Sequence, residues 1–166
     1  MVAGTLDSVP AALRGLCVAA HDPAATLVSR SGLGNGARVA GDVLMTQHGR
    51  QPSSLRCVIR AEREWQSAWP ALVLGFAPET PPSVDFARFT VVVATLGELG
   101  GSGPLVGIDS VFPSPGGAAV RVNAIDTGAG CGEGDLITRP MDVVTIPRVS
   151  GEVRFLEHRS RGAPCE

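Results

Sequence analysis

The sequence predicts an α+β domain made mainly of antiparallel β-sheet, sandwich-like in architecture, with one principal helix. The 21 Gly and 13 Pro in 166 residues favour short strands and frequent turns over long helices. Several apolar runs are rich in valine and threonine, which is typical of strands. A single segment has a clear helical period. A chain of this length is expected to form one domain, and its 44% hydrophobic content suffices for a buried core.

The central part of the chain predicts a β-hairpin with a long tip. Residues 89–96 are apolar and rich in valine, as in a strand buried on both faces. A glycine-rich turn follows at residues 97–103, and residues 105–112 alternate as in a second strand. That alternation predicts one face with Val106, Ile108, Ser110 and Phe112 and a second, partly wet face with Leu105, Gly107, Asp109 and Val111.

Residues 61–72 change to a helical period. Trp65, Trp69 and Leu72 fall on one apolar face, and charged residues lie on the other. Pro70 is expected to end or kink the helix near Trp69, because proline lacks a backbone N–H. The two tryptophans are therefore predicted to have a structural role, sealing the helix onto a sheet.

The remaining elements are expected to be short. Proline- and glycine-rich turns separate them, and a proline-stiffened connector spans residues 76–83. They are, in order, a helical turn at residues 8–15, strands at 16–20, 26–29, 43–47, 55–60 and 118–125, and a closing hairpin that joins 141–146 with 152–156.

Composition and charge exclude several classes of function. All 14 basic residues are arginine, and they are scattered through a chain of net charge −2, so no nucleic-acid partner is expected. No apolar run approaches a membrane span. Residues 1–16 do not resemble a signal peptide, so we expect either a cytosolic protein or a mature region. No cofactor is predicted: the glycine-rich string at residues 32–37 precedes a strand-like segment, not the helix of a dinucleotide site.

Four cysteines lie at positions without a CxxC pair, and no metal site is predicted. Cys17 and Cys57 fall in apolar runs, where ordinary buried thiols are expected. Cys131 lies in a glycine-rich loop and Cys165 near the end of the chain, so a bridge between them is the preferred hypothesis. A bridge would indicate an oxidising compartment. Two bridges are also open, with three possible pairings.

One string is similar to an active-site motif. Residues 125–130, IDTGAG, match the retroviral type of aspartic protease, in which one Asp from each of two subunits forms a carboxylate pair. Too few strands are expected after Asp126 for that fold, so a turn role is preferred. Ser102, His21, His48 and His158 offer no nucleophile and base in an evident arrangement, and we predict that the chain is not an enzyme.

The order of several motifs resembles the PrcB C-terminal domain family. The most specific are the helix with W-x-x-x-W and the following P-x-VDF string; the others are V-I at residues 58–59, VVV at 91–93, Gly97, the GGSG turn, Ile108, Val111, Cys131, Thr138, Pro140 and residues 144–147. The resemblance spans about residues 55–157. It divides the chain into a family-like part, residues 55–166, and an unmatched part, residues 1–54, that is expected to pack on the same domain.

The resemblance implies a function. The namesake of the family is a lipoprotein that stabilises a secreted bacterial protease complex, so a non-catalytic accessory domain, bound to a partner protein outside the cytoplasm, is expected. Family members often have a cysteine where this chain has Cys131, which favours its pairing with Cys165.

The expected roles of individual residues follow from this hypothesis. Asp85 and Phe86 are expected to fix the connector to the central strand. The expected partner-binding residues lie in two loops and are Gly97, Gly100, Gly101, Ser102, Gly103, Asp126 and Arg139. The first alternative is a protease inhibitor that acts through exposed loops, and the second is a dimeric aspartic protease that uses Asp126. The oligomeric state stays open.

Overall fold

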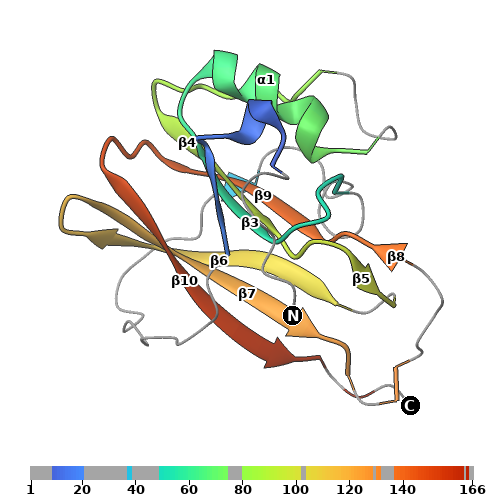
Figure 1. Ribbon diagram of the computed structural model, residues 1–166. Coiled ribbons are helices and arrows are strands. Elements are labelled where there is room, and N and C mark those ends of the chain that lie inside the picture. The colour runs from blue at the N-terminus through green and yellow to red at the C-terminus, as the bar shows by residue number, and fades with distance from the viewer. Residues whose placement is uncertain are drawn as a thin grey trace.

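The computed structural model describes residues 9–20, 37–38, 49–74, 80–101, 104–128, 130–131, 137–162 and 164. The expected strands at residues 26–29 and 43–47 lie outside this part of the chain, as do Ser102, Gly103, His21, His48 and Cys165. The elements are η2 (Ala11–Leu13), β1 (Cys17–Ala19), β2 (Ala37–Arg38), β3 (Leu55–Ile59), α1 (Glu62–Leu72), β4 (Phe89–Thr95), β5 (Leu99–Gly100), β6 (Leu105–Ser114), β7 (Gly117–Asp126), β8 (Ile137–Thr138), β9 (Met141–Pro147) and β10 (Glu152–Arg161) (Figure 1).

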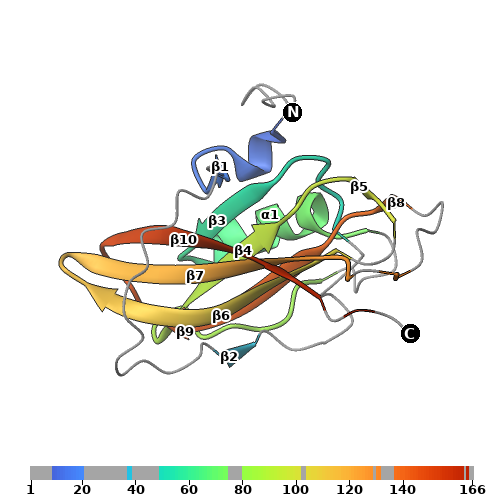
Figure 2. The ribbon, with the colours of Figure 1, turned by 90° about the horizontal axis from the view of Figure 1, so that it is seen from below.

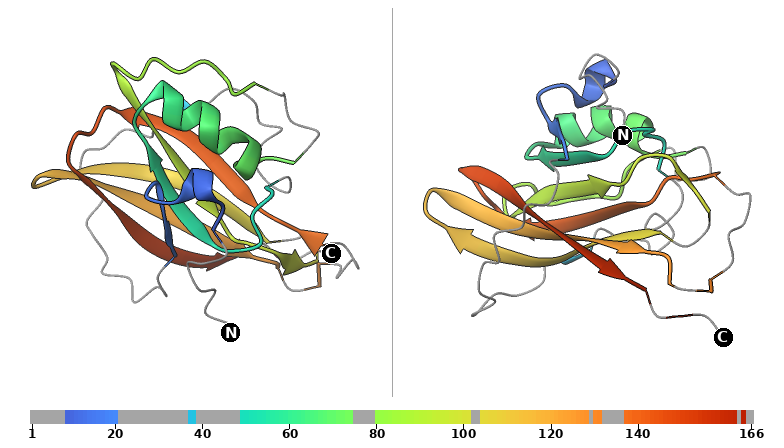
Figure 3. Two further views of the ribbon diagram at one scale, coloured as in Figure 1. Left: turned by 45° about the horizontal axis from the view of Figure 1, so that its top comes forward. Right: turned by 60° about the horizontal axis from the view of Figure 1, so that its bottom comes forward.

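Two sheets pack face to face, and the helix covers one of them. A five-stranded sheet has the order β1-β3-β4-β9-β2, and a three-stranded sheet has the order β10-β7-β6. Figure 3 shows the resulting layers, with α1 and η2 on the outer side of the larger sheet. All strand pairs are antiparallel except β7 with β10. The predicted class, a mainly antiparallel α+β domain with one principal helix, is confirmed.

The sandwich has two ends that differ in construction. At one end, which we name the turn end, the chain passes from β6 to β7 at residues 115–116 and from β9 to β10 at residues 148–151. At the other end, which we name the ribbon end, β5 and β8 form a separate two-stranded ribbon. Figure 1 shows β5 and β8 together beyond the strands of the sandwich, on the side opposite the β6–β7 turn.

Helix α1 seals the outer face of the larger sheet with its tryptophans. Trp65 and Trp69 are fully buried in an apolar cluster, and their rings meet edge to face with 4.9 Å between centroids. The indole N–H of Trp65 donates to the carbonyl oxygen of Pro82 at 2.9 Å. Of the two effects expected of Pro70, an end or a kink near Trp69, the end does not occur there, since α1 continues to Leu72. Pro70 is exposed and lies in the last turn, where the missing N–H affects one hydrogen bond only.

The predicted central hairpin does not form. β4 pairs with β3 and β9 in the larger sheet, whereas β6 pairs with β7 in the smaller sheet. The predicted closing hairpin is wrong for the same reason, because β9 belongs to the larger sheet and β10 pairs with β7. In both cases the connecting segment crosses between the two layers. β4 is buried on both faces because α1 covers one and the smaller sheet covers the other.

A β-bulge reverses the predicted alternation in β6. Ile108 faces Val122 in the register, but Ser110 faces Arg121, so Asp109 is the extra residue. Val106, Ile108 and Val111 therefore enter the cluster between the sheets, and Phe112 does not. Arg121 donates two hydrogen bonds to the Asp109 carboxylate. These bonds raise the pKa of the Arg121 guanidinium above its ordinary value, although partial burial opposes the rise.

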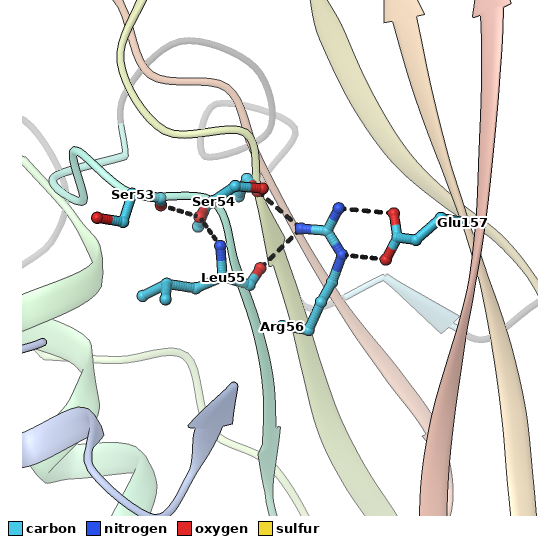
Figure 4. A network of polar contacts seen from close by, with 6 residues as sticks. Ser53, Ser54, Leu55, Arg56 and Glu157 are labelled. Carbon is cyan, nitrogen blue, oxygen red and sulfur yellow. Dashed lines mark hydrogen bonds and ion pairs between the residues drawn. The ribbon is translucent and has the colours of Figure 1, made fainter. Parts of the chain in front are cut away.

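Polar contacts join the two sheets at both long edges of the sandwich. Arg56 on β3 is 3% exposed and forms a bidentate pair with Glu157 on β10, with N–O distances of 2.7 and 2.8 Å (Figure 4). Its Nη1 atom donates to the backbone carbonyls of Leu55 and Thr95. On the opposite edge, the buried Asp142 of β9 accepts a hydrogen bond from the Ile108 amide of β6 at 2.7 Å.

A disulfide links the first strand to the third. Cys17 and Cys57 are direct partners in the β1–β3 register, with their Cα atoms 4.0 Å apart, and they are disulfide-bonded. The bridge excludes the interpretation as ordinary buried thiols and agrees with the alternative of two bridges that the sequence left open. The sequence offered no reason to join them, because the register that brings them together involves strands 40 residues apart. In the same region Leu13 is fully buried in the α1 cluster.

Candidate functional site

The ribbon end joins the two loops that the sequence singled out. Leu99 pairs with Thr138 and Gly100 with Ile137. The Thr138 hydroxyl donates to the carbonyl oxygen of Gly101 at 2.9 Å. Figure 2 shows β5 and β8 side by side from below. The ribbon continues the adjacent β4–β9 pair. Where the ribbon meets this pair of strands, the Leu96 amide donates to the Pro140 carbonyl.

Gly97 has a structural role in the ribbon. It is buried and has a φ of +80°, which L-residues other than glycine rarely adopt. A Cβ at this position would lie 2.7 Å from the Pro52 carbonyl oxygen. The next amide, that of Glu98, donates to the same Pro52 oxygen at 3.1 Å. Gly97 therefore positions the start of the ribbon and offers no surface to a partner.

Gly100 and Gly101 have open surroundings. A Cβ on either residue would meet no heavy atom of the described residues within 4 Å. Ile137, opposite Gly100, is 66% exposed, and the only other exposed large apolar residue in the described part of the chain is Val18 on β1. Sequence reasoning missed Ile137. In the sequence, only its place shortly after the polar string CGEGD could have indicated that its side chain is exposed.

Arg139 and Glu98 form an exposed ion pair at the base of the ribbon. Both the Nε and Nη2 atoms of Arg139 donate to the same oxygen of Glu98, at 3.2 and 2.6 Å. Their side chains are 31% and 43% exposed, so the pair is screened by water and contributes little to stability. Arg139 was among the predicted binding residues, and Glu98 was not.

Asp126 ends β7 and lies away from the ribbon pairing. Its carboxylate is 3.5 Å from the Arg159 guanidinium, and both side chains are at least half exposed. Its carbonyl oxygen accepts a hydrogen bond from the Gly162 amide at 2.8 Å. The arrangement is that of a surface ion pair at a strand end. The turn after it is closed by the Cys131 amide, which donates to the Gly128 carbonyl at 3.3 Å.

Cys131 is disulfide-bonded, as the sequence predicts. Its predicted partner, Cys165, lies outside the described residues, so the pairing of these two stays a prediction. Together with the first bridge, this leaves no free thiol among the described cysteines.

A small polar cluster on the outer face of the three-stranded sheet was not predicted. The Asn123 side-chain oxygen is 3.0 Å from His158 Nδ1 and accepts a hydrogen bond from the Ser160 hydroxyl at 3.1 Å. Ser160 donates to the amide and not to the imidazole, so His158 does not activate it as a nucleophile. The signal for this cluster is the i, i+2 spacing of His158 and Ser160, which places both on one face of β10.

Asp85 and Phe86 lie just before β4 and make local contacts. The Asp85 carboxylate accepts a hydrogen bond from the Ala87 amide at 3.0 Å. Val84 and Phe86 pack against the cluster beneath α1. Arg148 donates to the Phe86 carbonyl, which ties the connector to the loop that leaves β9. These residues lie at the turn end and brace the scaffold.

Within the described residues, no helix is long and apolar enough to cross a membrane. The same residues contain no group of three or more His, Cys, Asp and Glu side chains that could hold a metal ion. Comparison of the chain with protein-family models, with curated proteins and with solved structures found no match. The resemblance to the PrcB C-terminal domain family therefore stays a prediction.

Proposed function

We propose that this chain is a non-catalytic binding domain that holds and stabilises a partner protein at its ribbon end. The observation that carries the proposal is the 66% exposure of Ile137 on a ribbon whose neighbouring glycines have open surroundings. A single exposed apolar residue is ordinary on a protein surface. The argument therefore rests on its place: a short ribbon at the end of a rigid sandwich, the usual position of binding segments.

The rest of the scaffold supports this use of the ribbon. Two disulfide-bonded strands, a tryptophan-sealed helix and an ion pair between the sheets hold the sandwich together. A rigid scaffold lowers the entropy lost on binding, because its surface residues are already in position. The sequence resemblance suggests a secreted protease complex as the partner.

A non-catalytic role also accounts for Asp126 and Ser160. Asp126 is engaged in a surface ion pair with Arg159, and Ser160 donates to Asn123. Neither arrangement pairs a nucleophile with a base, which catalysis of acyl transfer needs. Substitution of Asp126 by Asn tests the aspartic-protease alternative: if every detected activity is unchanged, that alternative is refuted.

Site-specific photo-crosslinking in the native host tests the proposal. A photoreactive phenylalanine is placed at position 137, and a matched control is placed at Arg63, which is exposed on α1. We expect one dominant adduct from position 137 that is absent from position 63. The same adducts from both positions would refute the ribbon end as the binding surface. A parallel assay against a panel of purified proteases identifies an inhibitor instead, if one enzyme loses activity stoichiometrically.

A further inference from the structure

Four residues form a square on one face of the ribbon. Gly100 lies opposite Ile137 in the β5–β8 register. Continuing that register by one residue places Glu98 opposite Arg139, in agreement with their ion pair. Residues two apart on a strand share a face, so both pairs lie on the same side of the ribbon. We name this set, Glu98, Gly100, Ile137 and Arg139, the ribbon square.

Gly100 leaves an apolar position of the ribbon square uncovered. In antiparallel pairs a large side chain is normally covered by its cross-strand neighbour. Here that neighbour is Gly100, which has no side chain, and a Cβ there would meet no atom within 4 Å in the part of the chain that the structure describes. Its φ is not positive either, so the backbone conformation does not require glycine. A strand glycine that neither packing nor conformation demands is typical of a place where a ligand or another backbone approaches closely.

The ion pair of the ribbon square leaves one nitrogen and one oxygen without a partner among the described residues. Arg139 binds a single oxygen of Glu98, through Nε and Nη2. Among the described residues, Glu98 Oε1 and Arg139 Nη1 have no hydrogen-bond partner. A free donor and a free acceptor on the same face of the ribbon can each bind a backbone amide unit, which presents a carbonyl oxygen and an N–H. Such recognition of main-chain groups with a side-chain anchor is a recurring mode of peptide binding.

We infer that the ribbon square binds an extended polypeptide segment of the partner that carries one large apolar side chain. That side chain lies over Gly100 against Ile137, and the amide next to it is bound by Arg139 and Glu98. The inference rests on the proposed function, since it names the kind of partner segment that the ribbon end takes. The apolar anchor supplies most of the affinity, because the exposed charges remain in contact with water.

Selection of linear peptides displayed on phage tests the inference on the full chain. We expect the enriched 12-residue peptides to share an aromatic or large aliphatic residue. A synthetic copy, measured by fluorescence polarisation, should bind Ile137→Ser at least tenfold more weakly than the wild type. The matched control is Val18→Ser, which removes the other exposed large apolar side chain and should change the affinity less than twofold.

The substitution Gly100→Val distinguishes a loss of peptide binding from a loss of stability. Valine fills the open position and covers Ile137 from within the ribbon, so the urea midpoint should equal or exceed that of the wild type. Peptide affinity should nevertheless fall at least tenfold. A loss of binding caused by general damage would instead lower the midpoint, so the two measurements together identify the square as the contact.

Several results would overturn the inference. The first is a set of enriched peptides that share no apolar residue. The second is a peptide affinity that neither Ile137→Ser nor Gly100→Val changes. The third is a loss of peptide affinity in Val18→Ser instead. A dimer in sedimentation that Ile137→Ser converts to a monomer would identify a second copy as the occupant. If crosslinking at position 137 succeeds while no peptide binds, the proposed function stands and the peptide inference fails.

Discussion

Glycines at the two ends of the sandwich serve opposite purposes. At the turn end, a Cβ on Gly117 or Gly151 would lie 1.8 or 1.7 Å from a backbone oxygen of the facing loop. At the ribbon end, a Cβ on Gly100 or Gly101 would meet none of the described atoms within 4 Å. Gly117 and Gly151 are therefore needed so that two backbones can approach, whereas Gly100 is unpacked. At the ribbon end, the buried Gly97, where the ribbon starts, also has a close contact, with Pro52.

The difference indicates which end serves folding and which serves binding. At the turn end, Arg60 donates to the Val149 and Gly151 carbonyls at 3.1 and 2.8 Å and holds the crossing between the sheets. At the ribbon end, the charged pair of Arg139 and Glu98 stays exposed and leaves polar atoms to spare. Substitutions at the turn end should therefore affect stability, and those at the ribbon end should affect binding.

The largest effect on stability is expected inside the sandwich, at the buried ion pair of Arg56 and Glu157. Arg56→Met removes the partner of Glu157, which is 11% exposed, so folding would bury an unpaired charge. We expect the free energy of unfolding to fall by about 3–5 kcal/mol. Arg139→Met, at the exposed pair of the ribbon end, should change it by less than about 1 kcal/mol. Urea denaturation of both variants measures the contrast.

A double substitution provides the control for this prediction. Replacing both Arg56 and Glu157, by Met and Leu, removes the buried charges together and should restore most of the lost stability. If Arg56→Met and Arg139→Met lower the free energy of unfolding equally, burial does not determine how much each ion pair contributes to stability.

The next prediction compares the loss of stability on substituting a glycine at each end of the sandwich. Gly151→Ala forces a Cβ into the Gly116 carbonyl, which cannot move without opening the turn. We expect a loss of about 3 kcal/mol. Gly100→Ala should stay within about 0.5 kcal/mol of the wild type. Thermal unfolding measures both, and a similar loss in the two variants would break the comparison of the ends.

Removal of the two Arg60 hydrogen bonds should have an intermediate effect on the free energy of unfolding. Arg60→Met leaves the carbonyls of Val149 and Gly151 to water, and we expect a loss of about 1–2 kcal/mol. Amide hydrogen exchange should also become faster at Val149 and Glu152, which donate within the same crossing. Unchanged exchange at these amides, with the helix amides as reference, would contradict the assigned role.

The smallest effect on stability is expected at the ribbon end. Ile137→Ser replaces a side chain that is 66% exposed, so the free energy of unfolding should change by less than about 0.5 kcal/mol. Guanidinium denaturation measures this, with buried Leu72→Ser as the destabilising reference. A loss above about 1.5 kcal/mol at Ile137 would make it a packing residue and remove the basis for a binding surface.

The comparison also shows where sequence reasoning succeeded and failed in the fold. The period of residues 61–72 predicted α1 and its buried tryptophans, and alternation predicted β7 to within one residue at each end. Pairing was predicted wrongly for β4 with β6 and for β9 with β10. Neighbouring strands in sequence usually pair, but here short connections cross from one layer to the other.

The candidate site was predicted in outline only. The two glycine-rich loops do meet at one end, in the β5–β8 pair. Gly97 is buried, and Asp126 lies at a different strand end, so neither belongs to the ribbon square. Ile137 was missed because periodicity measures the face on which a residue lies. It does not measure whether another element covers that face.

Local pattern alone determines much of this protein: the helix, most of the described strands and the tight turns. These features depend on residues close together in the chain, where propensity and hydrogen-bonding needs act directly. Sheet pairing, the Cys17–Cys57 bridge, the Arg56–Glu157 pair and the exposure of Ile137 all depend on contacts between distant segments. Packing of the two sheets and the helix sets those contacts, because the layers bury apolar surface only in one mutual arrangement.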